Sequence, residues 1–60
     1  MCEFKVILGE EEIFRDVIYV KVEDEKIFLR DVLGESKEVL DCQIREIDVT
    51  STTLTLSRKR

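Results

Sequence analysis

The fold is decided by residues 18–29, which read Ile18-Tyr19-Val20-Lys21-Val22-Glu23-Asp24-Glu25-Lys26-Ile27-Phe28-Leu29. Aliphatic side chains recur at every second position on both sides of Asp24-Glu25, a period typical of strands that bury one face. The pair Asp24-Glu25 makes a short hairpin connection, although it lacks the favoured Asn-Gly or Asp-Gly chemistry. The stretch therefore predicts two antiparallel strands, the second of them near Lys26 to Val32.

Toward the N-terminus the same period continues, with one interruption. Alternating apolar residues between Phe4 and Leu8 predict a first strand, and Gly9 favours a turn because glycine readily adopts a positive φ. The apolar phase then changes between Ile13 and Ile18, so the chain between them must contain a bend or a bulge. We expect the second strand to be long and strongly curved.

Toward the C-terminus, Gly34 marks a second turn and the alternation resumes from Leu40 to Ile44. The apolar phase slips between Ile44 and Ile47, because these residues are three positions apart and not two or four, and this predicts a kink or a single helical turn. A closing strand is expected over residues 53–57, where leucines alternate with β-branched residues.

Five short strands with short connections predict an all-β fold, a small five-stranded SH3-like (Sm-like) barrel. Residues 1–60 are expected to form one domain, with 57–60 as a basic, disordered tail. The chain contains no proline, so its edge strands lack a common blocking residue and two chains can be expected to pair.

Composition excludes several classes of function. Three of the ten positive charges lie in Arg58-Lys59-Arg60, which leaves seven positive against fourteen negative charges in the rest of the chain. The excess of negative charge in residues 1–57 repels phosphate and argues against nucleic acid as a partner. No stretch is apolar enough to span a membrane and the start lacks a signal-peptide core, so a cytoplasmic protein without membrane contact is expected.

Enzyme signatures are missing from the sequence. The chain has no histidine, no glycine-rich phosphate loop and no Gly-x-Ser-x-Gly nucleophile motif, so we expect no enzymatic activity. The acidic runs 10–12 and 23–25 are interpreted as solvated turns rather than calcium ligands. Asp31 and Asp48 interrupt apolar alternations, and we interpret them as side chains that fix turns.

The two cysteines differ in context. Thiols generally stay reduced in the cytosol, so a disulfide between Cys2 and Cys42 is not expected. Cys42 is in phase with a buried strand face and is predicted to pack in the core. Removal of Met1 would leave Cys2 with a free α-amino group, and its amine and thiolate form a five-membered chelate ring. Two such chains together supply two nitrogens and two sulfurs, a donor set that suits Ni(II) or Cu(II). The alternative is that Cys2 is an ordinary terminal cysteine that binds no metal.

The order of short motifs resembles the CooT family, small proteins associated with nickel handling around carbon monoxide dehydrogenase and also described generically as predicted RNA-binding proteins. The likeness runs nearly end to end, and Met1-Cys2 is its most specific part. The motifs that carry it are Met1-Cys2, Lys5-Val6, Glu12-Ile13, Asp16-Val17, Asp31 with Leu33-Gly34, Ile44-x-x-Ile47-Asp48, Leu54 and Leu56.

This resemblance implies an SH3-like or Sm-like barrel, a homodimer, and one nickel ion held between the protomers by Cys2. It further implies a metallochaperone-like role, with a nickel enzyme as the client. Only Cys2 is carried over as a ligand.

Two rival functions stay open at this point. Small β-barrels can present aromatic side chains to single-stranded nucleic acid, and the candidates are Phe4, Phe14, Tyr19 and Phe28. The acidic body argues against this function, and three or four of these aromatics are expected in the core. A protein-interaction barrel is the other rival, and it requires a large exposed apolar patch beyond the dimer interface.

Overall fold

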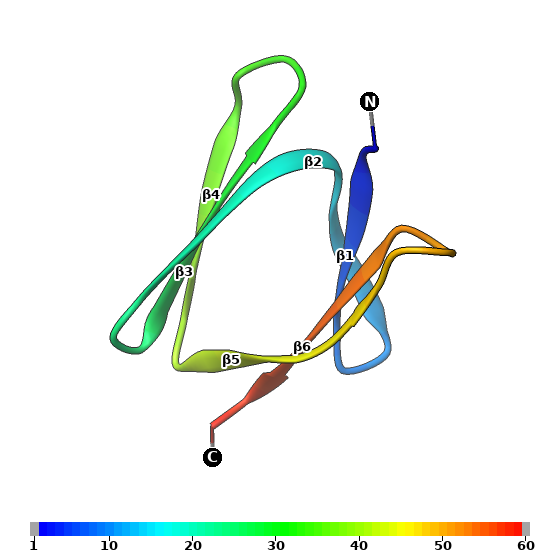
Figure 1. Ribbon diagram of the computed structural model, residues 1–60. Helices are drawn as coiled ribbons and strands as arrows, with labels where there is room; N and C mark the ends of the chain where they lie inside the picture. Colours follow the sequence, from blue (N-terminus) through cyan, green and yellow to red (C-terminus); the bar gives the residue numbers. More distant parts are fainter. Residues whose placement is uncertain (1, 60) are drawn as a thin grey trace.

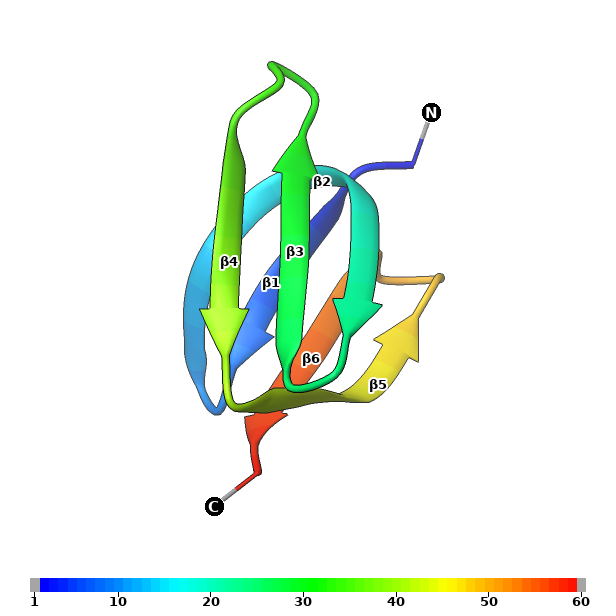
Figure 2. The same cartoon turned by 90° about the vertical axis from the view of Figure 1, so that its left-hand side faces the viewer.

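The computed structural model describes residues 2–59 and contains six strands in one sheet. The sheet order is β4-β3-β2-β1-β6-β5, and Figures 1 and 2 show the sheet curling around its inner face. The strands are β1 (Phe4–Leu8), β2 (Glu11–Glu23), β3 (Lys26–Asp31), β4 (Ser36–Leu40), β5 (Cys42–Asp48) and β6 (Thr53–Arg58).

The predicted all-β class is confirmed, and the architecture is consistent with an SH3-like fold. The strand number of five was wrong, because Asp41 interrupts the expected fourth strand with a φ of 57° and separates β4 from β5. The Asp41 amide donates a hydrogen bond to the carbonyl of Glu25 at 2.7 Å, which joins the β4–β5 connection to the β2–β3 turn.

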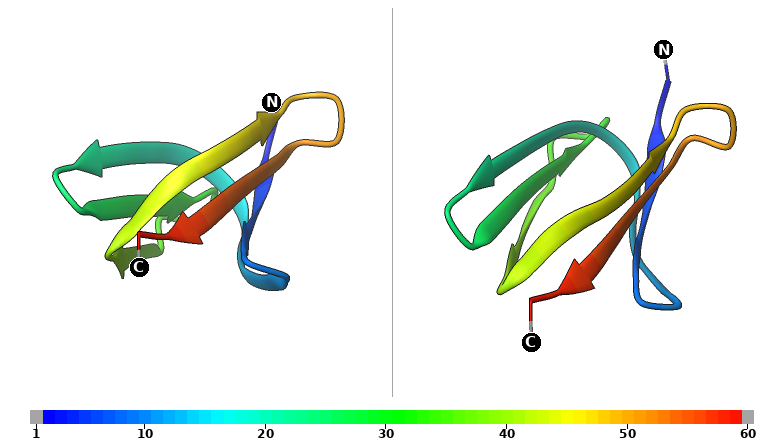
Figure 3. Two further views of the ribbon diagram at one scale, coloured as in Figure 1. Left: turned by 90° about the horizontal axis from the view of Figure 1, so that it is seen from below. Right: turned by 60° about the horizontal axis from the view of Figure 1, so that its bottom comes forward.

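The sheet is curled without closing into a hydrogen-bonded barrel. Within residues 2–59, β4 and β5 are the two edges of the sheet and do not pair with each other. Figure 3 shows the β5–β6 hairpin opposite the second half of β2, with the start of β5 toward the β2–β3 turn. One side of the molecule is therefore left open between β2 and β5.

The bend predicted in β2 is confirmed as a bulge at Asp16. This residue has a φ of 56°, and the register of β2 shifts against both β1 and β3 in this region. Aspartate tolerates the left-handed region better than most residues, because its short side chain can hydrogen-bond locally. The bulge lets one 13-residue strand pair with β1 in its first half and with β3 in its second half.

The kink predicted after Ile44 is a second bulge. The register of β5 against β6 shifts between Ile44 and Glu46, and the strand continues without a helical turn. β6 then pairs parallel to β1, with Val6 opposite Leu54. This pairing places the first and last strands side by side in the middle of the sheet.

The core lies between the curled halves of the sheet. Its largest fully buried side chains are Ile27, Leu29, Leu56, Val6, Val17 and Cys42. The predicted disordered tail 57–60 was wrong at its first residues, because Ser57 and Arg58 belong to β6 and pair with β5. Residue 60 lies outside the described residues. No helix within residues 2–59 is long and apolar enough to cross a membrane.

Candidate metal centre

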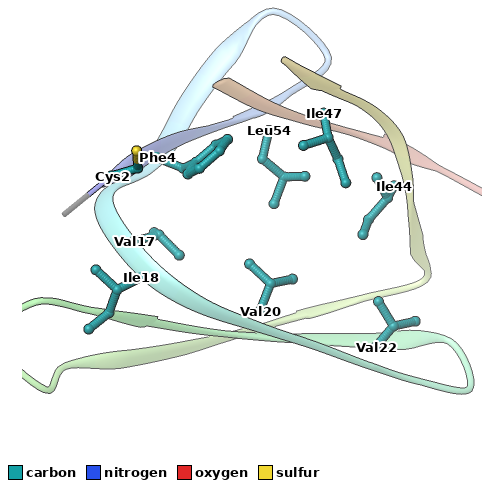
Figure 4. A pocket seen from close by; sticks show the side chains of 9 residues that line it. All are labelled: Cys2, Phe4, Val17, Ile18, Val20, Val22, Ile44, Ile47 and Leu54. Atoms are coloured by element: carbon teal, nitrogen blue, oxygen red, sulfur yellow. The ribbon is translucent and has the colours of Figure 1, made fainter. Parts of the chain in front are cut away.

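An apolar groove of about 340 Å³ lies on the open inner side of the sheet. Figure 4 shows the second half of β2 as one wall and side chains of β5 and β6 as the other. Its nine lining residues are Cys2, Phe4, Val17, Ile18, Val20, Val22, Ile44, Ile47 and Leu54.

The groove exposes aliphatic surface that a closed barrel would cover. Ile18 is 45% exposed, Val22 53% and Ile47 59%. None of the nine lining residues is charged, although charged residues make up 40% of the chain. Depletion of charge over an apolar strip is typical of the centre of a protein interface.

Cys2 lies at one end of this groove. It directly precedes β1, and the pairing of Phe4 with Val17 holds the start of β1 against β2 just beyond the Asp16 bulge. The side chains of Phe4 and Val17 also line the groove, and Figure 4 shows Cys2 beside Phe4. Cys2 is exposed and its thiol is free.

One chain offers few donors for a metal ion. Within residues 2–59 no group of three or more His, Cys, Asp or Glu side chains is arranged to hold a metal. The prediction that Cys42 packs in the core is confirmed, because it is only 1% exposed at the start of β5. Cys2 is thus the accessible thiol, and the side-chain donors within the described residues of one chain do not complete a metal site around it.

The carboxylates singled out from the sequence have structural roles. Asp31 Oδ1 accepts hydrogen bonds from the amides of Leu33 at 3.0 Å and Glu35 at 2.9 Å, which fixes the β3–β4 turn. Asp48 Oδ1 accepts a bond from the hydroxyl of Thr50 at 2.6 Å and from the amides of Thr50 and Ser51. Both predictions of turn-fixing aspartates are confirmed.

These contacts also set the electrostatics of the exposed turns. The Thr50 hydroxyl, followed by the Ser51 amide, holds the pKa of Asp48 below its ordinary value, because both donate to the charged carboxylate. Arg15 Nε donates to Glu12 at 2.7 Å, which lowers the pKa of Glu12 and raises that of Arg15. Neither pair lines the groove.

A family model for the CO dehydrogenase accessory protein CooT matches residues 1–57 of this 60-residue chain. The chain belongs to the CooT family. The resemblance based on the motif order from Met1-Cys2 to Leu56 is therefore confirmed. A search of curated proteins returned no match.

In this CooT family member the aromatic side chains divide between the two faces of the sheet. Phe4 and Phe14 pack against the core, as expected. At least one of Tyr19 and Phe28 was expected there too, but both lie on the other face of β2 and β3, where Tyr19 is 40% exposed. Tyr19 follows Ile18 and precedes Val20, so the strand alternation directs it away from the groove.

The groove is the part of this candidate site that the sequence interpretation missed. Alternating Ile18, Val20 and Val22 predicted a buried strand face, and the structure leaves that face half open. A side chain lining a closed core and one lining an open groove follow the same period of two. The period of two therefore carries no signal that separates these two cases.

Proposed function

We propose that this CooT family member binds nickel, holding one Ni(II) between two copies of the chain through Cys2, and that it serves a nickel enzyme as a metallochaperone. The observation that carries the proposal is the exposed Cys2 thiol at the end of an uncharged apolar groove. Membership in a family of CO dehydrogenase accessory proteins supports a nickel enzyme as the client.

The donor chemistry favours nickel once Met1 is removed. Cys2 then offers an amine nitrogen and a thiolate sulfur that close a five-membered chelate ring. Two copies together provide two nitrogens and two sulfurs, a set that matches the tetragonal preference of Ni(II). No histidine is needed, and the sequence contains none.

The groove supports the second copy of the chain as the partner that completes the site. Most homodimers have two-fold symmetry, so the same surface faces itself across the axis. Pairing through the groove would cover Ile18, Val22 and Ile47, and each 100 Å² of apolar surface removed from water contributes about 2.5 kcal/mol. An axis near the Cys2 end would bring the two thiols together.

Delivery to a client requires that the ion stay accessible. Cys2 lies before the first strand and outside the hydrogen-bonded sheet. A site built at this position can exchange its ion with a competing ligand set without unfolding the sheet. This property suits a carrier better than a permanent structural site.

The test is titration of the reduced protein with Ni(II), after mass spectrometry has verified that Met1 is absent. Thiolate-to-nickel absorbance bands report coordination, and native mass spectrometry reports the number of ions per dimer. Cys2→Ser removes the proposed ligand, and Cys42→Ala is the matched control that removes the other thiol, with circular dichroism to check the fold.

We expect one ion per two chains, with thiolate bands that vanish in Cys2→Ser and persist in Cys42→Ala. Nickel binding of unchanged affinity and stoichiometry in folded Cys2→Ser would contradict the proposed site. A dimer that forms without binding nickel would support the groove as the dimer interface and contradict Cys2 as a nickel ligand.

A further inference from the structure

The face of β2 and β3 opposite the groove carries an aromatic pair with an arginine stacked over it. Tyr19 and Phe28 meet edge to face, with ring centroids 6.2 Å apart and an interplanar angle of 73°. Arg30 is the register partner of Tyr19. Its guanidinium carbon lies 4.6 Å from the Tyr19 centroid and 5.9 Å from the Phe28 centroid.

These three residues, which we call the Arg30 platform, form part of a shallow hollow of about 250 Å³. The hollow is completed by Lys21 and Glu23. Strand alternation places its β2 residues on the face opposite Val20 and Val22, which line the groove. Covering the groove with a second chain therefore leaves the Arg30 platform free.

Arg30 is held in place without a carboxylate partner. The three ion pairs among residues 2–59 use Arg15, Lys21 and Lys26, and no hydrogen bond of the described chain involves the Arg30 guanidinium. The neighbouring lysines are paired, Lys21 with Glu23 at 3.3 Å and Lys26 with Glu38 at 3.5 Å. Arg30 is thus the cation of this face whose donors are available to a ligand.

We propose that the Arg30 platform docks an acidic segment of a partner protein, with Arg30 binding a carboxylate and the Tyr19 and Phe28 rings contacting the adjacent apolar side chain. A guanidinium binds a carboxylate through two parallel N–H donors, a geometry that a lysine cannot provide. Stacking on two rings orients the guanidinium before the partner arrives, which lowers the entropy lost on binding. Tyrosine and arginine also dominate the energetic centres of protein interfaces.

Charge decides between a protein and a nucleic acid as the occupant. A nucleic acid strand needs several unpaired cations along its backbone, and its affinity depends on how many phosphates they neutralise. The platform offers one unpaired cation, because the lysines beside it are paired with Glu23 and Glu38. A single carboxylate needs only one guanidinium, so the acidic peptide fits and the polyanion does not.

The test is NMR titration of the 15N-labelled full chain with a capped hexapeptide that carries one glutamate followed by one leucine, with serine at the other positions. The same peptide with glutamine in place of glutamate is the neutral probe. Arg30→Gln removes the proposed carboxylate ligand, Arg30→Lys keeps the charge without the two-point geometry, and Arg45→Gln removes an equal charge from exposed Arg45 on β5. A uridine decamer is the nucleic acid probe.

We expect the acidic peptide to shift the Arg30 side-chain N–H and the amides of Tyr19 and Phe28. The dissociation constant should rise about tenfold in Arg30→Gln and with the neutral peptide, because a charge-assisted hydrogen bond is lost. The dissociation constant of Arg30→Lys should lie between those of the unaltered chain and Arg30→Gln. The dissociation constant of Arg45→Gln should equal that of the unaltered chain. Equal binding of the neutral peptide, an unchanged constant in Arg30→Gln, no shifts at the platform, or tighter binding of the uridine decamer there would each overturn the proposal.

Discussion

Phe4 of β1 is the register partner of Val17 of β2, and both side chains line the groove that ends at Cys2. The strand pairing that positions Cys2 therefore also builds the adjoining end of the groove. This shared origin links the candidate metal ligand to the surface that would bring a second copy beside it.

A charge in the groove should separate the two copies. Val22 lines the groove and is 53% exposed, so Val22→Asp should cost one chain only about 1 kcal/mol, chiefly because aspartate is disfavoured in strands. In a dimer paired through the groove, however, each new carboxylate would be desolvated against the partner's apolar surface without a charge partner. We expect a monomer in sedimentation velocity and at least about tenfold weaker nickel binding.

The matched control for this change is Val49→Asp, because Val49 is 64% exposed and does not line the groove. It should leave both dimer and nickel binding unchanged. Persistence of a nickel-loaded dimer in Val22→Asp would place the dimer interface elsewhere on the molecule.

Removal of the Asp31 carboxylate should weaken the β3–β4 turn. Asp31 is only 8% exposed, and its Oδ1 accepts two backbone hydrogen bonds, from Leu33 and Glu35. Asp31→Ala should lower the free energy of unfolding by about 2 kcal/mol in urea denaturation, because both amides lose a charged acceptor. Asp31→Asn retains an acceptor oxygen and should cost less, so equal losses in the two variants would contradict this role.

The β5–β6 turn should weaken in acid. Hydrogen bonds from Thr50 and Ser51 lower the folded-state pKa of Asp48. A carboxyl whose pKa is lower in the folded than in the unfolded state stabilises the fold fully above the unfolded value, and this contribution is lost as the pH falls through the folded value. NMR titration should show the Thr50 amide following the Asp48 carboxyl with a midpoint below that of an ordinary aspartate. A midpoint at or above the ordinary value would refute this assignment.

The two cysteines should differ in their effect on stability. Cys42 is 1% exposed, so Cys42→Ser places a hydroxyl in the core and should cost about 1 to 3 kcal/mol. Cys2 is exposed, so Cys2→Ser should leave the melting temperature of the metal-free protein unchanged. Thermal unfolding followed by circular dichroism compares them, and similar losses in both variants would show that Cys2 also supports the fold.

Local signals in the sequence were sufficient for much of the fold. The change of apolar phase before Ile18 located the Asp16 bulge, and the slip after Ile44 located the bulge in β5. Asp31 and Asp48 were identified as turn residues because their side chains bond to amides two to four residues away. Such contacts depend only on neighbouring residues, so short patterns report them.

Other features depend on contacts between distant segments and were missed or wrong. The break at Asp41 is anchored by the carbonyl of Glu25, which belongs to a different hairpin. The placement of both Tyr19 and the half-buried Phe28 on the outer face also escaped the sequence interpretation, since hydrophobic character alone does not tell which face of a strand the fold covers.

The sequence by itself determined the all-β class and the family, and it singled out Cys2 as the proposed metal ligand, because these depend on residue type, order and local period. Tertiary structure alone decided that β1 lies between β2 and β6, that the curled sheet stays open between β2 and β5, and that Cys2 borders the resulting groove. The physical reason is that a period of two assigns side chains to two faces of a strand, whereas only the pairing and curl of the whole sheet determine which of those faces is covered.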